Sequence, residues 1–388
     1  METFDEILKK LPAYIQTAEQ MKEVLIANLV MVGEFPAPSF NEQERVDFLI
    51  NRFKEAALHH HWVDEAGNAV GTIEGREGRK NILVVAHADT VFPKDVNHTM
   101  QVEPERITGP GVADNSLGLA VLSTLPLLLK NADISFKSNV ILVGSTKSLG
   151  RGNLRGLRSF LSHFNNPIKA GISLEGAQLG RLSHTSIGML RGEIRCTIPD
   201  TYDWTRFGQA SAILTVNELI NHINEIEIPQ RPRSRIVLGS IRAGSSFTTA
   251  KRATLRFEIR SESLDIVKSL KDRLEEIIKQ VSSQSADSIE LEIFAERKPG
   301  GTDFTHPLVR NAHKILEALN VESKPGPSTS ALSTFIDREI PAITLGISKA
   351  ANLRNENASI ETEPMFTGIA QILAILQAID GGFCEEDR

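Results

Sequence analysis

Two side chains that could do chemistry follow one apolar run of this 388-residue sequence. His87 and Asp89 lie near the end of residues 81–92, a segment rich in aliphatic and β-branched residues. Such a run predicts a buried strand of a parallel sheet, and polar groups where that strand ends face the crevice in which α/β proteins place their sites. The histidine could bind a metal ion while the aspartate orients its ring. The alternative is a histidine that only forms structural hydrogen bonds.

Two acidic residues in later segments are candidate partners. Asp114 lies in the glycine-rich loop 108–118, and Glu175 lies at the end of a predicted strand, 170–176. Strands that alternate with helices predict a parallel sheet, whose strand ends share one edge. We therefore expect His87, Asp114 and Glu175 to converge, and this mixture of nitrogen and oxygen donors suits zinc. Two alternatives stay open: Asp114 caps a helix, or the three side chains form a polar cluster without metal.

The overall composition restricts the kind of protein. Charged residues make up 24% of the chain, and the net charge of −6 argues against nucleic-acid and membrane-surface partners, which select basic faces. The two cysteines, Cys196 and Cys384, have no metal-type spacing. The N-terminus lacks a signal-peptide pattern, and the longest apolar stretch, residues 117–129, is short for a membrane span. These features predict a cytoplasmic protein without a membrane partner.

The pattern of predicted elements changes twice along the chain. Residues 188–298 combine half-polar alternating strands with two helices in mixed order, which predicts a small α+β layer. Residues 1–187 and 299–388 instead alternate buried strands with helices. The sequence thus predicts an α/β domain, 1–187 with 299–388, that carries an inserted domain at 188–298.

Taken together, these stretches resemble the aminoacylase, carboxypeptidase G and succinyl-diaminopimelate desuccinylase family of co-catalytic zinc exopeptidases and amidohydrolases. The resemblance extends over nearly the whole chain and rests on residues 86–92, 109–114, 150–156, 174–176, Trp204, 207–208 with 211–213, Gly300 and 306–309. It implies a phosphorylase/hydrolase-like α/β fold, with a mostly parallel sheet flanked by helices and an inserted α+β lid. It also implies a homodimer paired through that lid, or dimerisation, domain.

The resemblance assigns roles to four residues. Members of the family hold two zinc ions bridged by an aspartate. By position in the motifs, His87 corresponds to the first histidine ligand and Asp89 to the residue that orients it. Asp114 corresponds to the bridging aspartate and Glu175 to the acidic ligand on the later strand. These positions imply that the half of the site around one metal ion is complete.

The other half departs from the family pattern. Ser148 and Leu149 occupy the positions of a glutamate pair that supplies the general base and a ligand of the second metal. A serine cannot replace a carboxylate as base at neutral pH, and leucine cannot bind zinc. The family's C-terminal histidine ligand is also missing, because the last histidine is His313, and Arg354 is its nearest counterpart.

The lid residues expected to contact substrate are changed as well. The histidine that polarises the substrate carbonyl should precede Trp204, where the chain has Tyr202 and Asp203. The family's lid asparagine falls on Phe247. The substrate therefore cannot be carried over from the family.

One hypothesis concerns the lost charge. A cation could fill the space of the missing metal, and Arg354 or Lys147 could lie against Asp114 and replace that metal electrostatically.

Two classes of function follow from these expectations. As an enzyme, the protein would hold one zinc or another divalent metal and hydrolyse an amide or peptide bond next to a carboxylate in a small molecule or short peptide. A second metal and ordinary two-metal activity are not expected. Alternatively, it would be a non-catalytic pseudo-enzyme that uses its cleft and its dimer for ligand binding or regulation.

Overall fold

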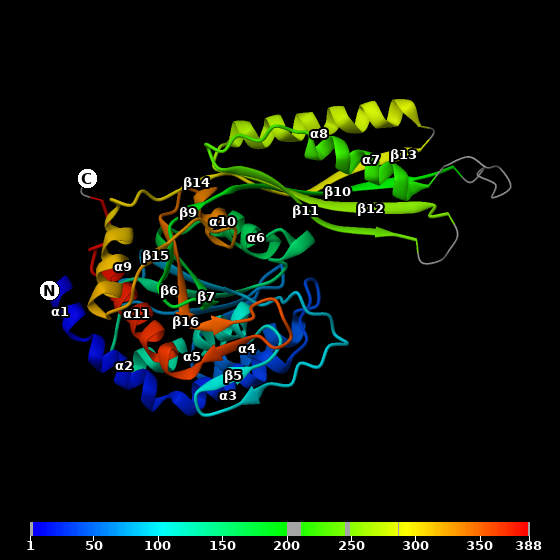
Figure 1. Ribbon diagram of the computed structural model, residues 1–388. Helices are drawn as coiled ribbons and strands as arrows, with labels where there is room; N and C mark the ends of the chain where they lie inside the picture. The colour runs from blue at the N-terminus through cyan, green and yellow to red at the C-terminus, as the bar shows by residue number, and fades with distance from the viewer. Residues whose placement is uncertain (1–2, 200–210, 245–248, 286, 387–388) are drawn as a thin grey trace. The chain divides into compact units, whose positions relative to one another are not determined.

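The computed structural model describes residues 3–199, 211–244, 249–285 and 287–386. The chain divides into two compact units, residues 1–186 with 301–388 and residues 187–300 (Figure 1). The boundaries predicted from the sequence lie one and two residues from these, since they were 187 and 299.

The larger unit contains an eight-stranded sheet. Its strands, in spatial order, are β1 (His60–Val63), β2 (Ala69–Ile73), β6 (Asn139–Ser145), β3 (Asn81–His87), β7 (Ile168–Ala177), β16 (Ala342–Ser348), β8 (Arg181–Ser183) and β15 (Lys324–Pro325). The neighbours β6, β3, β7 and β16 run parallel, so the prediction of a mostly parallel sheet is confirmed for its centre. Strand β16, from the C-terminal part of the chain, lies between β7 and β8.

Both faces of this sheet are covered, which explains the continuous apolar runs in its strands. Along β3, Ile82 and Val84 belong to one hydrophobic cluster, whereas Leu83 and Val85 belong to another. The first cluster includes residues of α1 (Phe4–Lys9), α2 (Leu11–Gln20), α3 (Lys22–Glu34), α4 (Gln43–Glu55), α5 (Leu117–Asn131), α9 (Pro307–Ala318) and α11 (Thr362–Asp380). The second includes residues of α6 (Arg155–His163) and α10 (Leu332–Ile336).

Two helical segments of the larger unit are unusually apolar. Val112–Asn131 and Thr362–Asp380 are long and apolar enough to cross a membrane by length and composition alone, but 83% and 78% of their apolar windows are buried inside the protein. The first is longer than the stretch 117–129 predicted from the sequence, because a π-helical turn, Val112–Ser116, continues into α5. Packing in the core accounts for the apolar composition of both segments.

A small antiparallel sheet leads into the glycine-rich loop 108–118 through its strand β5. It consists of β17 (Ala350–Ala351), β18 (Ser359–Glu361), β5 (Arg106–Thr108) and β4 (Gln101–Val102). The amide of Gly109, just after β5, donates to the carbonyl of Ala358. This pairing fixes the start of the loop that carries Asp114. The remaining short elements are β9 (Thr185–Ser186), β14 (Gly300–Gly301) and a 3-10 turn, Gly150–Gly152.

The smaller unit is an antiparallel sheet with two helices. The strands lie in the order β11 (Ser234–Ala243), β12 (Arg252–Ser261), β10 (Gly188–Thr197) and β13 (Ser288–Arg297). Helices α7 (Ala212–Asn224) and α8 (Leu264–Gln284) pack on it through a cluster that includes Ile194, Leu255, Leu219 and Leu274 (Figure 1). This is the predicted α+β arrangement.

Candidate metal centre

The three predicted ligands come from neighbouring segments at one end of the larger sheet. His87 ends β3, and Glu175 lies near the end of β7, the adjacent parallel strand. Val85 pairs with Ser173, so His87 and Glu175 occupy equivalent positions two residues further along. Asp114 belongs to the π-helical turn that precedes α5. Convergence of the three follows from the parallel strand order, as expected from the sequence.

The side chain of Asn115 holds the turn of Asp114 against β7. Its Nδ2 donates to the carbonyl of Leu174 at 2.8 Å, and its Oδ1 accepts from the amide of Gly176 at 2.9 Å. These two contacts lie on either side of Glu175 in the sequence. Asn115 is completely buried, so it fixes the position of Asp114 relative to Glu175. Sequence reasoning missed this role, although an asparagine directly after a candidate ligand was a visible signal.

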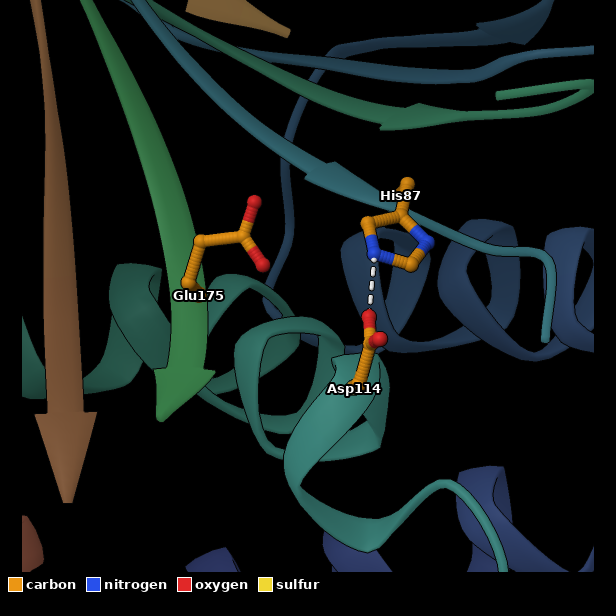
Figure 2. A group of neighbouring side chains, drawn as sticks. All are labelled: His87, Asp114 and Glu175. Atoms are coloured by element: carbon orange, nitrogen blue, oxygen red, sulfur yellow. Dashed lines mark hydrogen bonds and ion pairs between the residues drawn. The ribbon is translucent and has the colours of Figure 1, made fainter. Parts of the chain in front are cut away.

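The donor atoms of His87, Asp114 and Glu175 all lie within 4.8 Å of one another (Figure 2). His87 Nε2 lies 3.0 Å from Asp114 Oδ1. His87 and Glu175 are buried, whereas the side chain of Asp114 is 39% exposed. The cluster is thus enclosed on the side of the sheet and accessible through Asp114.

Asp89 fixes the orientation of the histidine ring. The backbone carbonyl of Asp89 lies 2.9 Å from His87 Nδ1, and its carboxylate Oδ1 lies 3.4 Å from the same nitrogen. Both groups only accept hydrogen bonds, so Nδ1 carries a proton and Nε2 is directed to the cluster. This is the orienting role that the sequence predicted for Asp89.

The carboxylate of Asp89 also holds the loop after β6. Its Oδ2 accepts hydrogen bonds from Ser39 Oγ at 2.6 Å and from the backbone amides of Ser148 at 2.9 Å and Leu149 at 2.7 Å. The hydroxyl of Ser148 is buried and lies 3.3 Å from Ser145 Oγ. Positions 148 and 149 therefore contact the site through their backbone and contribute no carboxylate to it.

Opposite charges determine the protonation of the cluster. Burial lowers the pKa of His87, but hydrogen bonds to Asp114 and Asp89 and the charge of Glu175 outweigh it, so the pKa lies well above its ordinary value. Burial raises the pKa of Asp114, yet the hydrogen bond and charge of His87 and the charge of Arg181 bring it below the usual value. For Glu175 burial prevails, and its pKa is raised despite the charges of His87 and Arg181.

The hypothesis that Lys147 or Arg354 lies against Asp114 does not agree with the structure. Lys147 Nζ donates to the carbonyl of Ala66 at 2.6 Å, and Arg354 is exposed. Neither of these described side chains forms a hydrogen bond or ion pair with Asp114. The sequence missed Arg181, at the start of β8, whose charge acts on both Asp114 and Glu175.

The predictions for the lid fall elsewhere. Tyr202, Asp203, Trp204 and Phe247 lie outside the described residues, so the substitutions expected at the lid positions stay predictions.

The donor set fits a divalent metal ion. One imidazole nitrogen and two carboxylates are common zinc ligands, and the second nitrogen of His87 is held by Asp89, as is usual for a metal-bound histidine. Glu175 accepts a hydrogen bond from the side chain of Ser330, which orients a second ligand. His87, Asp114 and Glu175 are the residues that would hold the ion.

Comparison with proteins of known sequence gives two findings. Residues 83–378 match the family model described as peptidase family M20/M25/M40. Carboxypeptidase G2 from Pseudomonas sp. (strain RS-16) is 32% identical over 151 residues, which are 38% of this chain and 35% of that relative. The match thus spans about a third of the length of this curated relative.

Solved structures with the same fold cover nearly the whole chain. The di-peptidase Dug1p from Saccharomyces cerevisiae has a TM-score of 0.78 at 13% identity and covers 96% of this chain and 98% of its own. A tripeptidase from Staphylococcus aureus has a TM-score of 0.74 at 17% identity, with 93% and 99% covered. An M20 family metallo-carboxypeptidase from Sulfolobus solfataricus also has a TM-score of 0.74, at 14% identity, with 92% and 99% covered.

At these low identities the structures establish the fold alone. The family model, however, spans most of the chain and contains His87, Asp114 and Glu175 within its limits. The chain therefore belongs to peptidase family M20/M25/M40.

Proposed function

We propose that this chain is a single-metal member of its family, in which His87, Asp114 and Glu175 bind one divalent cation, zinc in the first place. The observation that carries the proposal is a contrast within the centre. Three donors lie within 4.8 Å of one another, whereas Leu149 occupies the position of the second ion's acidic ligand and Ser148 that of the general base. A metal ion bound here supplies a Lewis acid that polarises a carbonyl group.

The substrate class we propose is an amide or peptide bond next to a carboxylate, in a small molecule or short peptide. The names of similar proteins, which include a carboxypeptidase, a tripeptidase and a di-peptidase, support this class. Asp89 and Ser330 orient two of the ligands. Ser148 cannot act as a general base, so turnover by the ordinary two-metal route is reduced by roughly two to four orders of magnitude.

A second candidate function is ligand binding without turnover. The arrangement of Ser148 favours it, since its amide is bound to Asp89 and its hydroxyl faces Ser145, away from any acidic partner among its described contacts. In this case the metal centre would hold a ligand, and the protein would act as a binding or regulatory pseudo-enzyme.

Metal analysis and a hydrolysis screen of the full chain separate these possibilities. We expect about one zinc ion per wild-type chain and none in His87→Ala. The exposed His163 provides a matched control, and His163→Ala should keep the metal. If wild type hydrolyses N-acyl amino acids, dipeptides or tripeptides and His87→Ala does not, the result supports the enzymatic function. Metal without turnover supports the binding function, and wild-type protein that binds no zinc contradicts the proposal.

Pairing of two copies through residues 188–298 and a cytoplasmic location stay predictions. Light scattering of the full chain tests the first, because a mass near 42.7 kDa would indicate a monomer and contradict it. Nucleic-acid and membrane partners are not proposed.

A further inference from the structure

Arg181 approaches the metal centre by a route that depends on the strand order. After β7 the chain crosses over β16 and returns as β8, which begins with Arg181. The crossing takes place at Gly346, where a Cβ atom would lie 1.9 Å from the carbonyl oxygen of Gln178. Gly346 pairs with Glu175 on one side, and the register of β8 brings Arg181 to its other side. Arg181 and Glu175 therefore flank the same residue of β16.

A chain of hydroxyl groups connects the two side chains. Arg181 Nη2 donates to Ser328 Oγ at 3.2 Å, and Ser328 Oγ lies 2.7 Å from Ser330 Oγ. Ser330 in turn forms a hydrogen bond with Glu175. Ser183 accepts from Arg181 Nε at 3.3 Å, and both Ser183 and Ser328 are buried. The guanidinium is thus held in place by neutral partners.

The positive charge of Arg181 is not consumed by a close ion pair. Its partners in the described part of the chain are hydroxyl groups, and no carboxylate lies within ion-pair distance of it there. Arg181 and Glu175 are neighbours across Gly346, which has no side chain to separate them, so the charge lies close to the carboxylate of Glu175. Because neutral partners do not cancel it, this charge acts on the whole cluster.

We propose that Arg181 is a built-in counter-charge of the metal centre, held by Ser183 and Ser328 beside Glu175, which supplies positive charge that a second divalent ion would otherwise provide. The role of counter-charge goes beyond the proposed function, and its link to a single ion rests on that function. Arg181 acts through Asp114 and Glu175 and is a positioning residue, since its described contacts include no donor atom of the centre.

Zinc titration of the metal-stripped full chain by calorimetry tests the proposal. We expect Arg181→Met to bind zinc about fivefold more tightly than wild type, because a repelling charge near the ion is removed. Arg181→Lys keeps the charge and should stay within about twofold of wild type. Ser328→Ala removes the hydrogen bond but not the charge, so zinc binding should not tighten. Arg338, an exposed arginine of the same unit, gives the control Arg338→Met.

Unchanged or weaker zinc binding by Arg181→Met would overturn the proposal, and so would tightening in Arg181→Lys or Ser328→Ala that equals it. The melting temperature of the metal-free chain is a second readout that needs no metal. It should fall by about 2 °C in Arg181→Met and not in Arg338→Met. If wild type binds no zinc, the single-metal function is wrong, but the melting temperatures still test the counter-charge. A lower melting temperature in Arg181→Met than in wild type and Arg338→Met supports it, and equal melting temperatures reject it.

Discussion

The two units of the molecule each contain a cluster of charged side chains, and the clusters differ in how their charges are balanced. In the smaller unit, Glu258 contacts both Arg191 and Arg260 across β10 and β12. On the same strands, Glu193 contacts Arg256 at 2.8 Å and also Arg195. We call this set the arginine–glutamate ladder; its members are Arg191, Glu193, Arg195, Arg256, Glu258 and Arg260. Each of its two carboxylates is held between guanidinium groups of the same unit.

The cluster in the larger unit is balanced differently. His87 lies within 4.8 Å of both Asp114 and Glu175 and is hydrogen-bonded to Asp114, and the side-chain hydrogen bonds of Arg181 in the described part of the chain go to hydroxyl groups. A carboxylate that already has two guanidinium partners has little affinity left for a metal ion, whereas two carboxylates that share an imidazole attract one. The comparison teaches that acidic residues mark a metal site only where the fold leaves their charge incompletely paired.

The largest expected effect is on zinc binding when a ligand is removed. Asp114→Ala should weaken zinc binding by at least about 100-fold, since even partners behind the ligands change affinity by one or two orders of magnitude. The exposed Asp95, from the same unit, gives the control Asp95→Ala, which should bind like wild type. Calorimetric titration measures both. If Asp114→Ala binds zinc as tightly as wild type, the claim that this cluster binds the metal is wrong.

The matching change in the ladder should affect stability and leave zinc binding unchanged. Glu258→Ala leaves Arg191 and Arg260 side by side without their carboxylate, at a cost of about 2 kcal/mol in the free energy of unfolding. Glu290, whose side chain is 70% exposed, gives the control Glu290→Ala with a change below about 0.5 kcal/mol. Urea denaturation followed by circular dichroism measures both. A loss of zinc binding in Glu258→Ala would contradict the separation of the two clusters.

A smaller effect on zinc affinity is expected when a residue that positions a ligand is changed. Asn115→Ala removes the two hydrogen bonds that tie the Asp114 turn to β7, so zinc affinity should fall by about tenfold. Asn131, exposed at the end of α5, provides the control Asn131→Ala. Titration with zinc compares the two variants. Equal affinities would show that strand order alone, without Asn115, places Asp114.

The smallest effect concerns acid sensitivity of the ladder. Burial raises the pKa of Glu258, but the charges and hydrogen bonds of Arg191 and Arg260 lower it further, and the net pKa lies below its usual value. Its stabilising contribution is therefore present above the unfolded pKa of about 4.3 and is lost as the pH falls through the lower folded value. The difference in unfolding free energy between wild type and Glu258→Gln should shrink by about 1 kcal/mol from pH 6 to pH 3. A difference that stays constant with pH would contradict this account.

Much of the fold could be predicted because the local patterns are strong. The strand predicted at 170–176 is Ile168–Ala177, and the apolar run 81–92, predicted to be a strand, contains β3, Asn81–His87. The apolar run of a strand that is buried on both faces is visible in consecutive residues of the sequence. The boundaries shifted by up to five residues, because the end of a strand depends on contacts with other parts of the chain.

The candidate site was predicted only in its ligands. His87, Asp114 and Glu175 could be found because each belongs to a strand end or the loop that follows one, and parallel strands bring such positions together. The surrounding cations could not be found in this way. Lys147 is close to Ser148 in sequence but directs its amine to Ala66, and Arg354 is exposed.

The sequence alone predicted the three candidate ligands, the absence of a carboxylate at Ser148 and Leu149, and the inserted second unit, because these depend on residue identity and on local periodicity. Only the tertiary structure decided which cation lies beside the centre. Arg181 reaches it because β16, more than 150 residues later in the chain, is inserted between β7 and β8 and carries a glycine where the connection crosses it. Strand order of this kind is set by long-range packing, which no local pattern of residues expresses.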